Sequence, residues 1–247
     1  MNSYLVFQLA GMQGSWGGIA CGERRQSHQH PTKSAIIGLI AASLGIKRSE
    51  HEKLNKLKNI QIAVQQFRCE NYLNDFHTTQ SPSEFGVKKF KKQYPYKVLT
   101  RRDELSIEDS STVLSTREYW MDMYYRVAIT IDNDEFSLET IQTALEYPKF
   151  HLYLGRKSCP LCLPLNPVII QANNLIDLFE TTKIEIPKFA SEQSYSKSQN
   201  YLTAKSRIFC DTSMVCCDNV CSEIRDEPSN RNLWEFNLRK KFELLTN

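Results

Sequence analysis

The chain has 247 residues, of which 41% are hydrophobic and 24% are charged. This balance is typical of a globular protein with a sizeable core, and the length fits one large domain or two small ones. The net charge of +3 is too mild to indicate a nucleic-acid partner by itself. Such a partner has to be argued from local clusters of charge.

No part of the chain predicts a targeting or membrane segment. Residues 1–10 have no basic residue ahead of their apolar run, unlike a secretory signal. The longest nearly apolar run, residues 35–46, is too short to span a bilayer. We therefore expect a cytoplasmic protein whose eight cysteines are reduced thiols rather than a disulfide framework.

The N-terminal residues predict a strand, a loop and a helix. In residues 3–9 the apolar Leu5, Phe7 and Leu9 recur at every second position, which is typical of a strand. A glycine-rich loop around Trp16 is expected to follow. Pro31 and Thr32 then open an apolar helix that reaches about Leu44, since proline at a helix start sacrifices no hydrogen bond.

The next elements complete an alternation of strands and helices. Ser49 is expected to start a short helix, with Glu52 in a capping box. Alternation over residues 60–64 predicts a second strand, and eleven alternating residues at 121–131 predict the strongest strand of the chain. Ser137 is expected to cap a further helix.

This order predicts an α+β fold. Strand, helix, strand, strand, helix is the split arrangement of ferredoxin-like and RRM-like domains, which we place at residues 1–155. Residues 72–119 form an insertion between the second and third strands, and a connection of that length is usually functional or disordered. Residues 156–247, rich first in proline and then in serine and glutamine, predict a small C-terminal lobe with irregular β-strands.

Residues 84–102, inside the insertion, hold the densest charge, seven cations against one glutamate. The cations are Lys88, Lys89, Lys91, Lys92, Lys97, Arg101 and Arg102, and the interleaved aromatic residues are Phe85, Phe90, Tyr94 and Tyr96. Cations contact phosphates, and flat rings stack on bases or wedge between them. A solvated charged loop is the alternative. The aromatic residues favour contact with RNA.

A second basic segment leads into the first long helix. It contains Arg24, Arg25, His28, His30 and Lys33. A helix N-terminus presents free N–H groups and a positive dipole end, which suit a phosphate. Thr32 or Ser34 could equally cap that helix, and both interpretations can hold together.

A third segment, residues 153–161, combines a glycine with two cations. Gly155 beside Arg156 and Lys157 would let the backbone approach a phosphate, and Tyr153 could stack on a base. Taken alone, this is a weak indication.

Cysteine spacing raises the question of zinc. Cys159 and Cys162 have the spacing of a zinc knuckle, and Cys217 and Cys221 could complete a site. The second pair has a different spacing and lies far away in sequence, so we expect buried or idle thiols, with no metal and no other cofactor. The flanking pattern also argues against a thioredoxin-like redox role.

No catalytic signature stands out. The chain has no Walker loop, no carboxylate cluster of metal-ligating spacing and no nucleophile elbow. Histidine, lysine and tyrosine can cut RNA without metal as general acid, general base and electrostatic stabiliser. His28, His30, Lys33 and His77 are of the right kinds, but nothing in their spacing demands that role.

Four segments together carry a family resemblance. GMQGSWG at 11–17, PTKSAIIGL at 31–39, YLGRKSCPL at 153–161 and RDEP at 225–228 resemble the CasD subunit of type I-E CRISPR Cascade, a RAMP-superfamily protein. DFHT at 75–78 matches as well. Each piece is weak alone, but together they follow the order and approximate spacing of that family.

The resemblance implies an RRM-like domain with a β-hairpin thumb. In that family the subunit holds the 5′ handle of the CRISPR RNA, and its thumb folds over the guide beside the first backbone subunit. It also contacts the large subunit that reads the PAM, so target DNA is an indirect partner and no membrane is involved. Guide maturation belongs to a separate endoribonuclease, which implies a protein that is not an enzyme.

The resemblance and the basic segments together select the candidate site residues. The expected handle-binding residues are Arg24, Arg25, His28, Thr32, Lys33, Ser34, Tyr153, Gly155, Arg156, Lys157 and Arg225. The expected thumb residues are Phe76, His77, Lys88, Lys89, Lys91, Lys92, Tyr94, Tyr96, Arg101 and Arg102. Type I-C relatives cut the repeat themselves, so a metal-independent CRISPR repeat endoribonuclease is the alternative. A zinc-knuckle RNA-binding protein outside CRISPR is a more distant one.

Overall fold

The computed structural model describes residues 1–68, 71–97, 99–107, 109–132, 135–182, 206–211, 214, 221–230, 233 and 235–245. Its strands are β1 (Asn2–Gly14), β2 (Ala20–Cys21), β3 (Arg24–Arg25), β4 (Gln61–Arg68), β5 (Asn71–Pro82), β6 (Ser110–Thr130), β7 (Val168–Ala172), β8 (Arg207–Asp211), β9 (Cys221–Asn230) and β10 (Glu235–Leu245). Its helices are α1 (Lys33–Leu44), α2 (His51–Lys56), the 3-10 helix η1 (Leu57–Asn59), α3 (Glu84–Gln93), α4 (Arg101–Leu105), α5 (Leu138–Glu146) and α6 (Leu175–Thr181).

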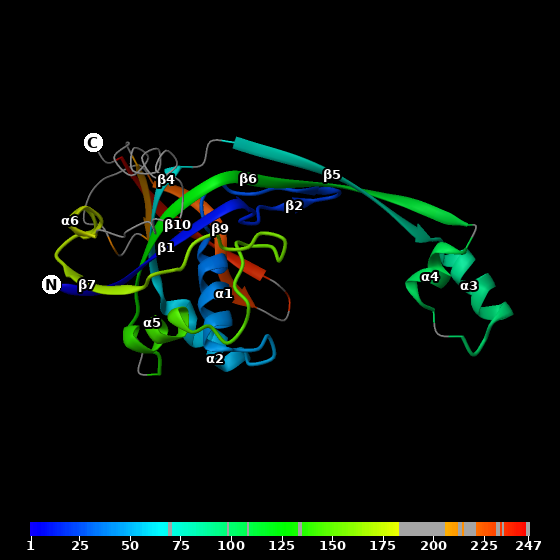
Figure 1. The fold of residues 1–247 in the computed structure, drawn as a ribbon, viewed down its shortest axis with the longest axis horizontal. Coiled ribbons are helices and arrows are strands. Elements are labelled where there is room, and N and C mark those ends of the chain that lie inside the picture. The colour runs from blue at the N-terminus through cyan, green and yellow to red at the C-terminus, as the bar shows by residue number, and fades with distance from the viewer. Residues whose placement is uncertain are drawn as a thin grey trace.

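The strands form one continuous sheet around β1, β6 and β4 (Figure 1). β7 pairs with β1, β1 with β6 and β6 with β4, each antiparallel. β8 adds to β4, and β10 and β9 follow it at the same edge. The predicted α+β class is confirmed, and the name ferredoxin-like stays an interpretation of this strand order. The division at residue 155 also stays a prediction, although the sheet runs across it.

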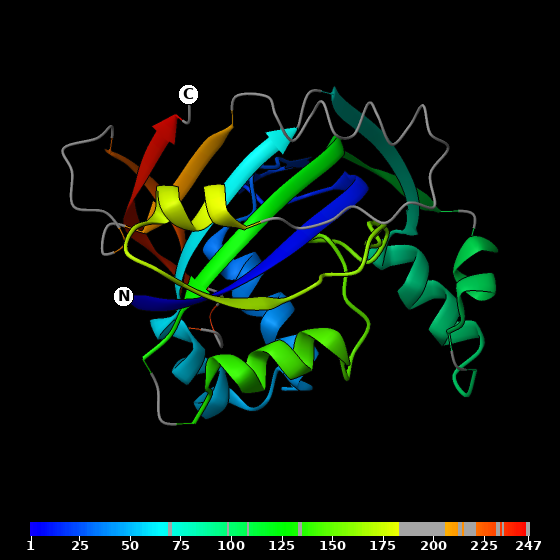
Figure 2. The ribbon, with the colours of Figure 1, turned by 60° about the vertical axis from the view of Figure 1, so that its left-hand side comes forward.

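Each face of the sheet has its own core. Leu5, Phe7 and Leu9 alternate along β1 toward a cluster shared with α1 and α5. Tyr4 and Val6 point to the other face, where α6 packs with β8. Figure 2 shows α6 and α1 on opposite sides of the strands. The periodicity of Leu5, Phe7 and Leu9 thus reflects one buried face, and burial of the other face explains the apolar Tyr4 and Val6 between them.

Three local predictions need correction. β1 does not end at Leu9 but continues to Gly14, so the first two glycines lie in a strand rather than in a loop. Pro31 precedes the cap of α1 instead of opening the helix, because Thr32 is the N-cap residue. The capping box from Ser49 is wrong, since α2 begins at His51 behind Glu50 and has no side-chain cap.

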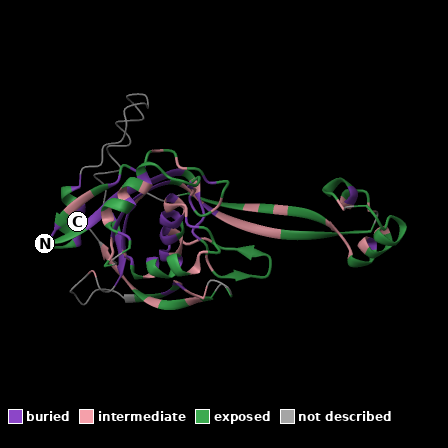
Figure 3. Cartoon of the chain, turned by 90° about the horizontal axis from the view of Figure 1, so that it is seen from below, coloured by how far each residue is buried: buried purple, intermediate pink, exposed green. Residues whose placement is uncertain are grey.

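The insertion is a long hairpin that leaves the body. β5 pairs with the first half of β6 from Asn71–Met121 out to Pro82–Ser110, and α3 and α4 lie at its tip. We call this unit, residues 71–121, the thumb; it projects far from the body in Figure 1. Figure 3 shows its residues mostly exposed or half-buried, while the body has a buried interior. Asp122, with a left-handed φ of 50°, marks the junction of the thumb with the body.

No helix of these described ranges is long and apolar enough to cross a membrane. The run of serine and glutamine at 191–200, Cys216, Cys217 and Trp234 lie outside the described residues.

Candidate nucleic-acid interface

Four segments that are far apart in sequence meet around one groove of about 1100 Å³. They are residues 15–20 after β1, the first turns of α1, residues 150–157 and the middle of β9. We call this the α1 groove, because residues of α1 from Ser34 to Ala42 line it. All four segments that carry the family resemblance therefore contribute to a single concave surface.

Gly155 is required by packing inside the protein. Its φ is +82°, and a Cβ there would lie 1.7 Å from the backbone oxygen of Ser15. Ser15 donates its own N–H to the Leu154 oxygen, at 3.1 Å. The glycine therefore allows close approach to the segment after β1, and its predicted role beside a phosphate stays a prediction.

The N-terminus of α1 is occupied by groups of the protein itself. Thr32 Oγ1 accepts from the Ala35 N–H at 3.3 Å, and the Lys33 N–H donates to Asp226 Oδ2 at 2.7 Å. The Lys33 ammonium, only 7% exposed, lies 3.2 Å from Glu227 Oε1 and 3.7 Å from Asp211 Oδ2. Lys33 thus pairs with carboxylates of the chain itself, and contact of Thr32 and Lys33 with a phosphate stays a prediction. The capping interpretation of Thr32 is confirmed.

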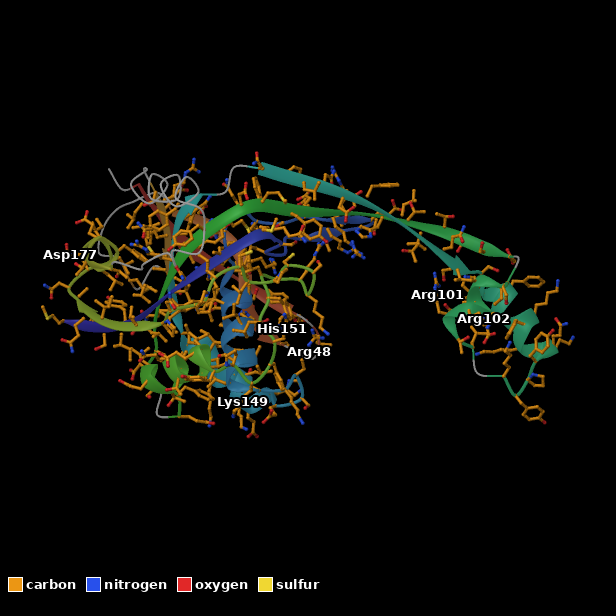
Figure 4. The ribbon with its side chains drawn as sticks, viewed as in Figure 1. Arg48, Arg101, Arg102, Lys149, His151 and Asp177 are labelled. Atoms are coloured by element: carbon orange, nitrogen blue, oxygen red, sulfur yellow. The ribbon has the colours of Figure 1, made fainter. Side chains whose placement is uncertain are left out.

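The rim of the α1 groove is cationic. Arg156, Lys157 and Arg225 line it, as do Lys47 and Arg48, which sequence reasoning missed. Figure 4 shows Arg48 beside His151 and Lys149 on the body. The Lys-Arg pair lies two residues after Gly45, which ends α1, so its position just after a helix was the available signal. Ser34 and Tyr153 line the groove as well.

Arg156 connects the groove with the root of the thumb. Its guanidinium carbon lies 4.9 Å from the ring centroid of Tyr119 on β6, a cation–π contact. Its Nη2 is 3.5 Å from the backbone oxygen of Arg25. Arg24 and Arg25 are exposed on β3, which runs beside β6 at the root of the thumb. The predicted cations of these two segments therefore lie on connected elements.

The tip of the thumb is a second basic surface. α3 presents Lys88, Lys89, Lys91 and Lys92, all exposed, and no carboxylate among the described residues pairs with them. Phe85 and Tyr96 are 70% and 99% exposed. Arg101 and Arg102 extend from α4 at the same tip (Figure 4), where Arg101 pairs with Glu104 at 2.9 Å. Tyr94 is 46% exposed, and its ring lies tilted against that of Phe90 with the centroids 5.1 Å apart.

Phe76 and His77 lie on β5, at mid-thumb. Phe76 is 63% exposed, and His77 forms an ion pair with Asp75. His77 faces Ser115 across the hairpin, three pairs beyond the Asn74–Glu118 pair. Glu118 accepts the Ser27 N–H at 3.0 Å. At about 3.3 Å per residue, His77 is displaced about 10 Å outward from that point, so the structure does not gather it with His28.

His28 and His30 lie between β3 and α1 in a partly closed environment. His30 is 5% exposed, stacks on Phe209 at 4.0 Å and accepts at Nε2 from the Lys241 ammonium at 2.7 Å. Burial, followed by the charge of Lys241, lowers the pKa of His30 to about 3. Burial also lowers the pKa of His28. With a pKa of about 3, His30 stays neutral near pH 7 and is a poor general acid.

The buried His30 predicts a loss of stability in mild acid. Its folded pKa lies below the unfolded value of 6.5, so its full contribution is present above pH 6.5 and is lost as the pH falls toward 3. Between pH 7 and pH 5 the free energy of unfolding should drop by about 2 kcal/mol from this residue. Urea titrations at both pH values should show that drop, and His30→Gln should reduce it. An unchanged drop in the variant would assign it to other groups.

The two cysteines of the predicted knuckle lie in different environments. Cys159 is buried in the core beside α1, and burial raises the pKa of its thiol. Cys162 is exposed. The side chains of Cys217 and Cys221 lie outside the described residues, and within the described ones no group of three histidine, cysteine or acidic residues could hold a metal. The absence of zinc therefore stays a prediction.

Comparison with known proteins identifies the family. Residues 4–234 match the family described as CRISPR-associated protein (Cas_Cas5). The chain is 32% identical to "CRISPR system Cascade subunit CasD" of Escherichia coli (strain K12) over 167 residues, which are 67% of this chain and 70% of that protein.

Solved structures share the fold. One is a chain titled "CRISPR RNA-guided surveillance complex", with a TM-score of 0.64, 21% identity, and coverage of 98% of this chain and 90% of that one. Another, "Crystal structure of Cas protein", has a TM-score of 0.56, 20% identity, and coverage of 98% and 94%. With a family match over nearly its whole length and a CasD relative at 32% identity, the chain belongs to the Cas5 family of CRISPR-associated proteins.

Proposed function

We propose that this chain is a non-catalytic RNA-binding subunit of a type I-E Cascade surveillance complex, which caps the 5′ handle of the CRISPR RNA. The α1 groove carries the proposal, because it brings the four family segments to one concave surface with a cationic rim. Single-stranded RNA binds where cations can follow the backbone and rings can stack on bases. The groove offers both, since Tyr153 and Phe150 line it with Arg156 and Lys157.

The thumb suits a second contact in the same assembly. Its two strands carry its tip about 40 Å from the body, counted as twelve residues at about 3.3 Å each. The relative from Escherichia coli is named a subunit of Cascade. We propose that the thumb of this chain lies over the guide beside a backbone subunit, that the body meets the large PAM-reading subunit, and that target DNA is contacted only indirectly. Such an assembly would act in the cytoplasm, without a cofactor.

The alternative is a metal-independent repeat endoribonuclease of the type I-C kind. It needs an acid, a base and a stabiliser at one phosphate, with a proton-transfer group near neutral pKa. The outward displacement of His77 and the low pKa of His30 favour binding without cleavage. In EDTA, an excess of protein should bind cognate repeat RNA and leave it intact for hours. Cleavage at the base of the repeat hairpin, lost in His77→Ala or His28→Ala, would favour the endoribonuclease.

Reversing two rim charges tests the binding proposal. Arg156→Glu with Lys157→Glu should weaken binding of the 5′-handle RNA by about 10- to 100-fold, because two phosphate contacts become repulsive. The slope of log affinity against log salt should also flatten by about 1.4, at about 0.7 per lost contact on a single strand. Fluorescence anisotropy over a salt series measures both.

The control carries the same change of charge outside the groove. Arg207 and Lys240 are exposed on β8 and β10 and do not line the groove. Arg207→Glu with Lys240→Glu should leave the affinity within about three-fold of the wild type, the residual change coming from net charge. Equal losses in the two double variants, both with wild-type melting temperature, would reject the groove as the binding surface.

A further inference from the structure

We propose that the floor of the α1 groove holds one nucleobase of the bound RNA, turned out of its stack, while the phosphates stay on the cationic rim. The inference rests on the proposed function and specifies which part of the RNA enters the groove. It derives from the face of α1, from two buried polar atoms and from the rings of the walls.

Apart from Leu39, the residues of α1 that line the groove have small side chains. Ala35, Gly38 and Ala42 line it at spacings of three and four residues, which places them on one side of the helix. Gly38 is exposed in mid-helix, where glycine is less favourable than alanine. A Cβ at Gly38 would have no neighbouring atom within 4 Å outside the helix backbone. No packing contact therefore requires the glycine, and the space above it is open.

Two polar atoms at this groove are buried without a hydrogen-bond partner. Ser15 is 3% exposed and lines the groove, and its Oγ has no partner in the structure. Arg156 also lines the groove, and its Nη1 is likewise buried without a hydrogen-bond partner. Leaving such atoms unpaired is costly, so they indicate an occupant with hydrogen-bonding edges rather than an aliphatic side chain.

The walls distinguish a base from a phosphate. Phe150, Tyr153 and Phe236 line the groove and can stack on a flat ring. The floor residues from α1 are uncharged, whereas Lys47, Lys157 and Arg225 stand at the rim. A phosphate on this floor would meet only the Arg156 guanidinium, because the other cations of the groove stand at the rim. A base with its flat faces against small side chains and rings, and its edge toward Ser15, matches the groove.

The test pairs a groove-filling substitution with abasic RNA. Gly38→Leu fills the open space above α1, whereas Gly38→Ala does not extend beyond Cβ. Thr143→Leu, at an exposed position of α5, controls for an added leucine. The 5′-handle RNA of the cognate repeat is prepared with an abasic site at each position in turn. At one position the abasic RNA should bind wild-type protein about five- to a hundred-fold more weakly, the range for one stacked base.

Coupling between the two changes decides the question. Gly38→Leu should weaken the binding of intact RNA by a similar factor. For RNA that is abasic at that one position, Gly38→Leu should cause no further loss of affinity. Gly38→Ala should weaken the binding of intact RNA less than Gly38→Leu does, and Thr143→Leu should bind intact RNA like the wild type. A 2-aminopurine at the same position should lose its accessibility to acrylamide when wild-type protein binds, which needs no variant.

The contrary outcomes are distinct. Gly38→Leu could weaken the binding of every abasic RNA by the same factor, or the 2-aminopurine could stay accessible to acrylamide at every position. In either case the base is not in the groove, and the inference is wrong while the proposal of RNA binding stands. If wild-type protein binds no handle RNA, the proposed function fails and the inference fails with it.

Discussion

Replacing Arg239 by alanine is expected to lower the free energy of unfolding by about 3–5 kcal/mol, the cost of removing one partner from a buried ion pair. Arg239 on β10 donates from Nε to Asp226 Oδ1 and from Nη1 to Asp211 Oδ1, each at 2.6 Å. The two carboxylates come from β9 and β8 and are 3% and 7% exposed. Without the guanidinium both lose their main cation and stay buried.

This network also holds the start of α1 against the C-terminal strands. Asp226 accepts the N–H of Lys33, and the Lys33 ammonium pairs with Glu227. Arg225, the neighbour of Asp226, stands at the rim of the α1 groove. We therefore expect Arg239→Ala to weaken the binding of the 5′-handle RNA as well, because β9, which carries Arg225, would lose its position.

An exposed ion pair on the same strands is the matched control for Arg239. Arg207 Nη1 lies 3.9 Å from Glu243 Oε1 between β8 and β10, and both side chains are largely exposed. Arg207→Ala should cost no more than about 0.5 kcal/mol. Arg239→Lys, which keeps the charge but loses the planar fork, should fall between the two. Urea unfolding of the three variants measures the series, and equal losses for Arg239→Ala and Arg207→Ala would contradict a buried network.

Patterns local in sequence predicted most of the central sheet and its helices. The alternation at 121–131 and the cap at Ser137 correspond to the end of β6 and to α5. The glycines at 11 and 14 were misread as a loop. A Cβ at Gly11 would lie 2.2 Å from Leu154 Cδ1, and one at Gly14 would lie 2.2 Å from Met123 Cε. These glycines permit close packing within a strand, a reason that sequence alone does not separate from a turn.

The helices of the thumb tip had signals that the charge obscured. Ser83 caps α3 by accepting from the Gly86 N–H, and Thr100 with Asp103 forms a capping box on α4. Both follow the ordinary start pattern of a helix. The density of lysine predicts a basic insertion that contacts RNA, with a charged loop as the alternative, and no helix is predicted there, whereas four of the lysines lie within α3.

The candidate site depended on long-range contacts to a greater degree. Arg156, Lys157 and Arg225 were predicted from segments that resemble a family, and the structure places all three around the α1 groove. The sequence predicts Lys33 as a phosphate contact. Its acidic partners Asp211 and Glu227 come almost 180 and 200 residues later, so they could not be foreseen. No local pattern reveals such a pairing, whereas a fold does.

Removing the thumb is expected to abolish assembly while leaving the body folded. A variant in which a short glycine-serine linker replaces residues 80–115 loses α3, α4 and the outer part of the hairpin. The removed residues are mostly exposed, so little apolar burial is lost. The cost of closing a loop grows slowly with its length, and a short linker does not strain the ends. The melting temperature should stay within a few degrees of that of the wild type.

Assembly should fail because the shortened chain loses the basic surface at the thumb tip, which the cations of the α1 groove do not replace. Seven lysines and arginines lie between residues 84 and 102, and the four lysines of α3 are exposed at the tip. Under the proposed function these contact the guide and the neighbouring backbone subunit. Size-exclusion chromatography of the purified backbone and large subunits with guide RNA should show no complete complex with the shortened chain.

A second variant separates the presence of the thumb from its charge. Lys88, Lys89, Lys91 and Lys92 are changed together to glutamine, which keeps α3 helical by intrinsic propensity and removes four charges from its exposed surface. We expect assembly at low salt to survive but to be lost at lower ionic strength than for the wild type, because phosphate contacts are screened. If the shortened chain assembles normally, the thumb is not an assembly element. If the glutamine variant has the salt tolerance of the wild type, the lysines do not contact the guide.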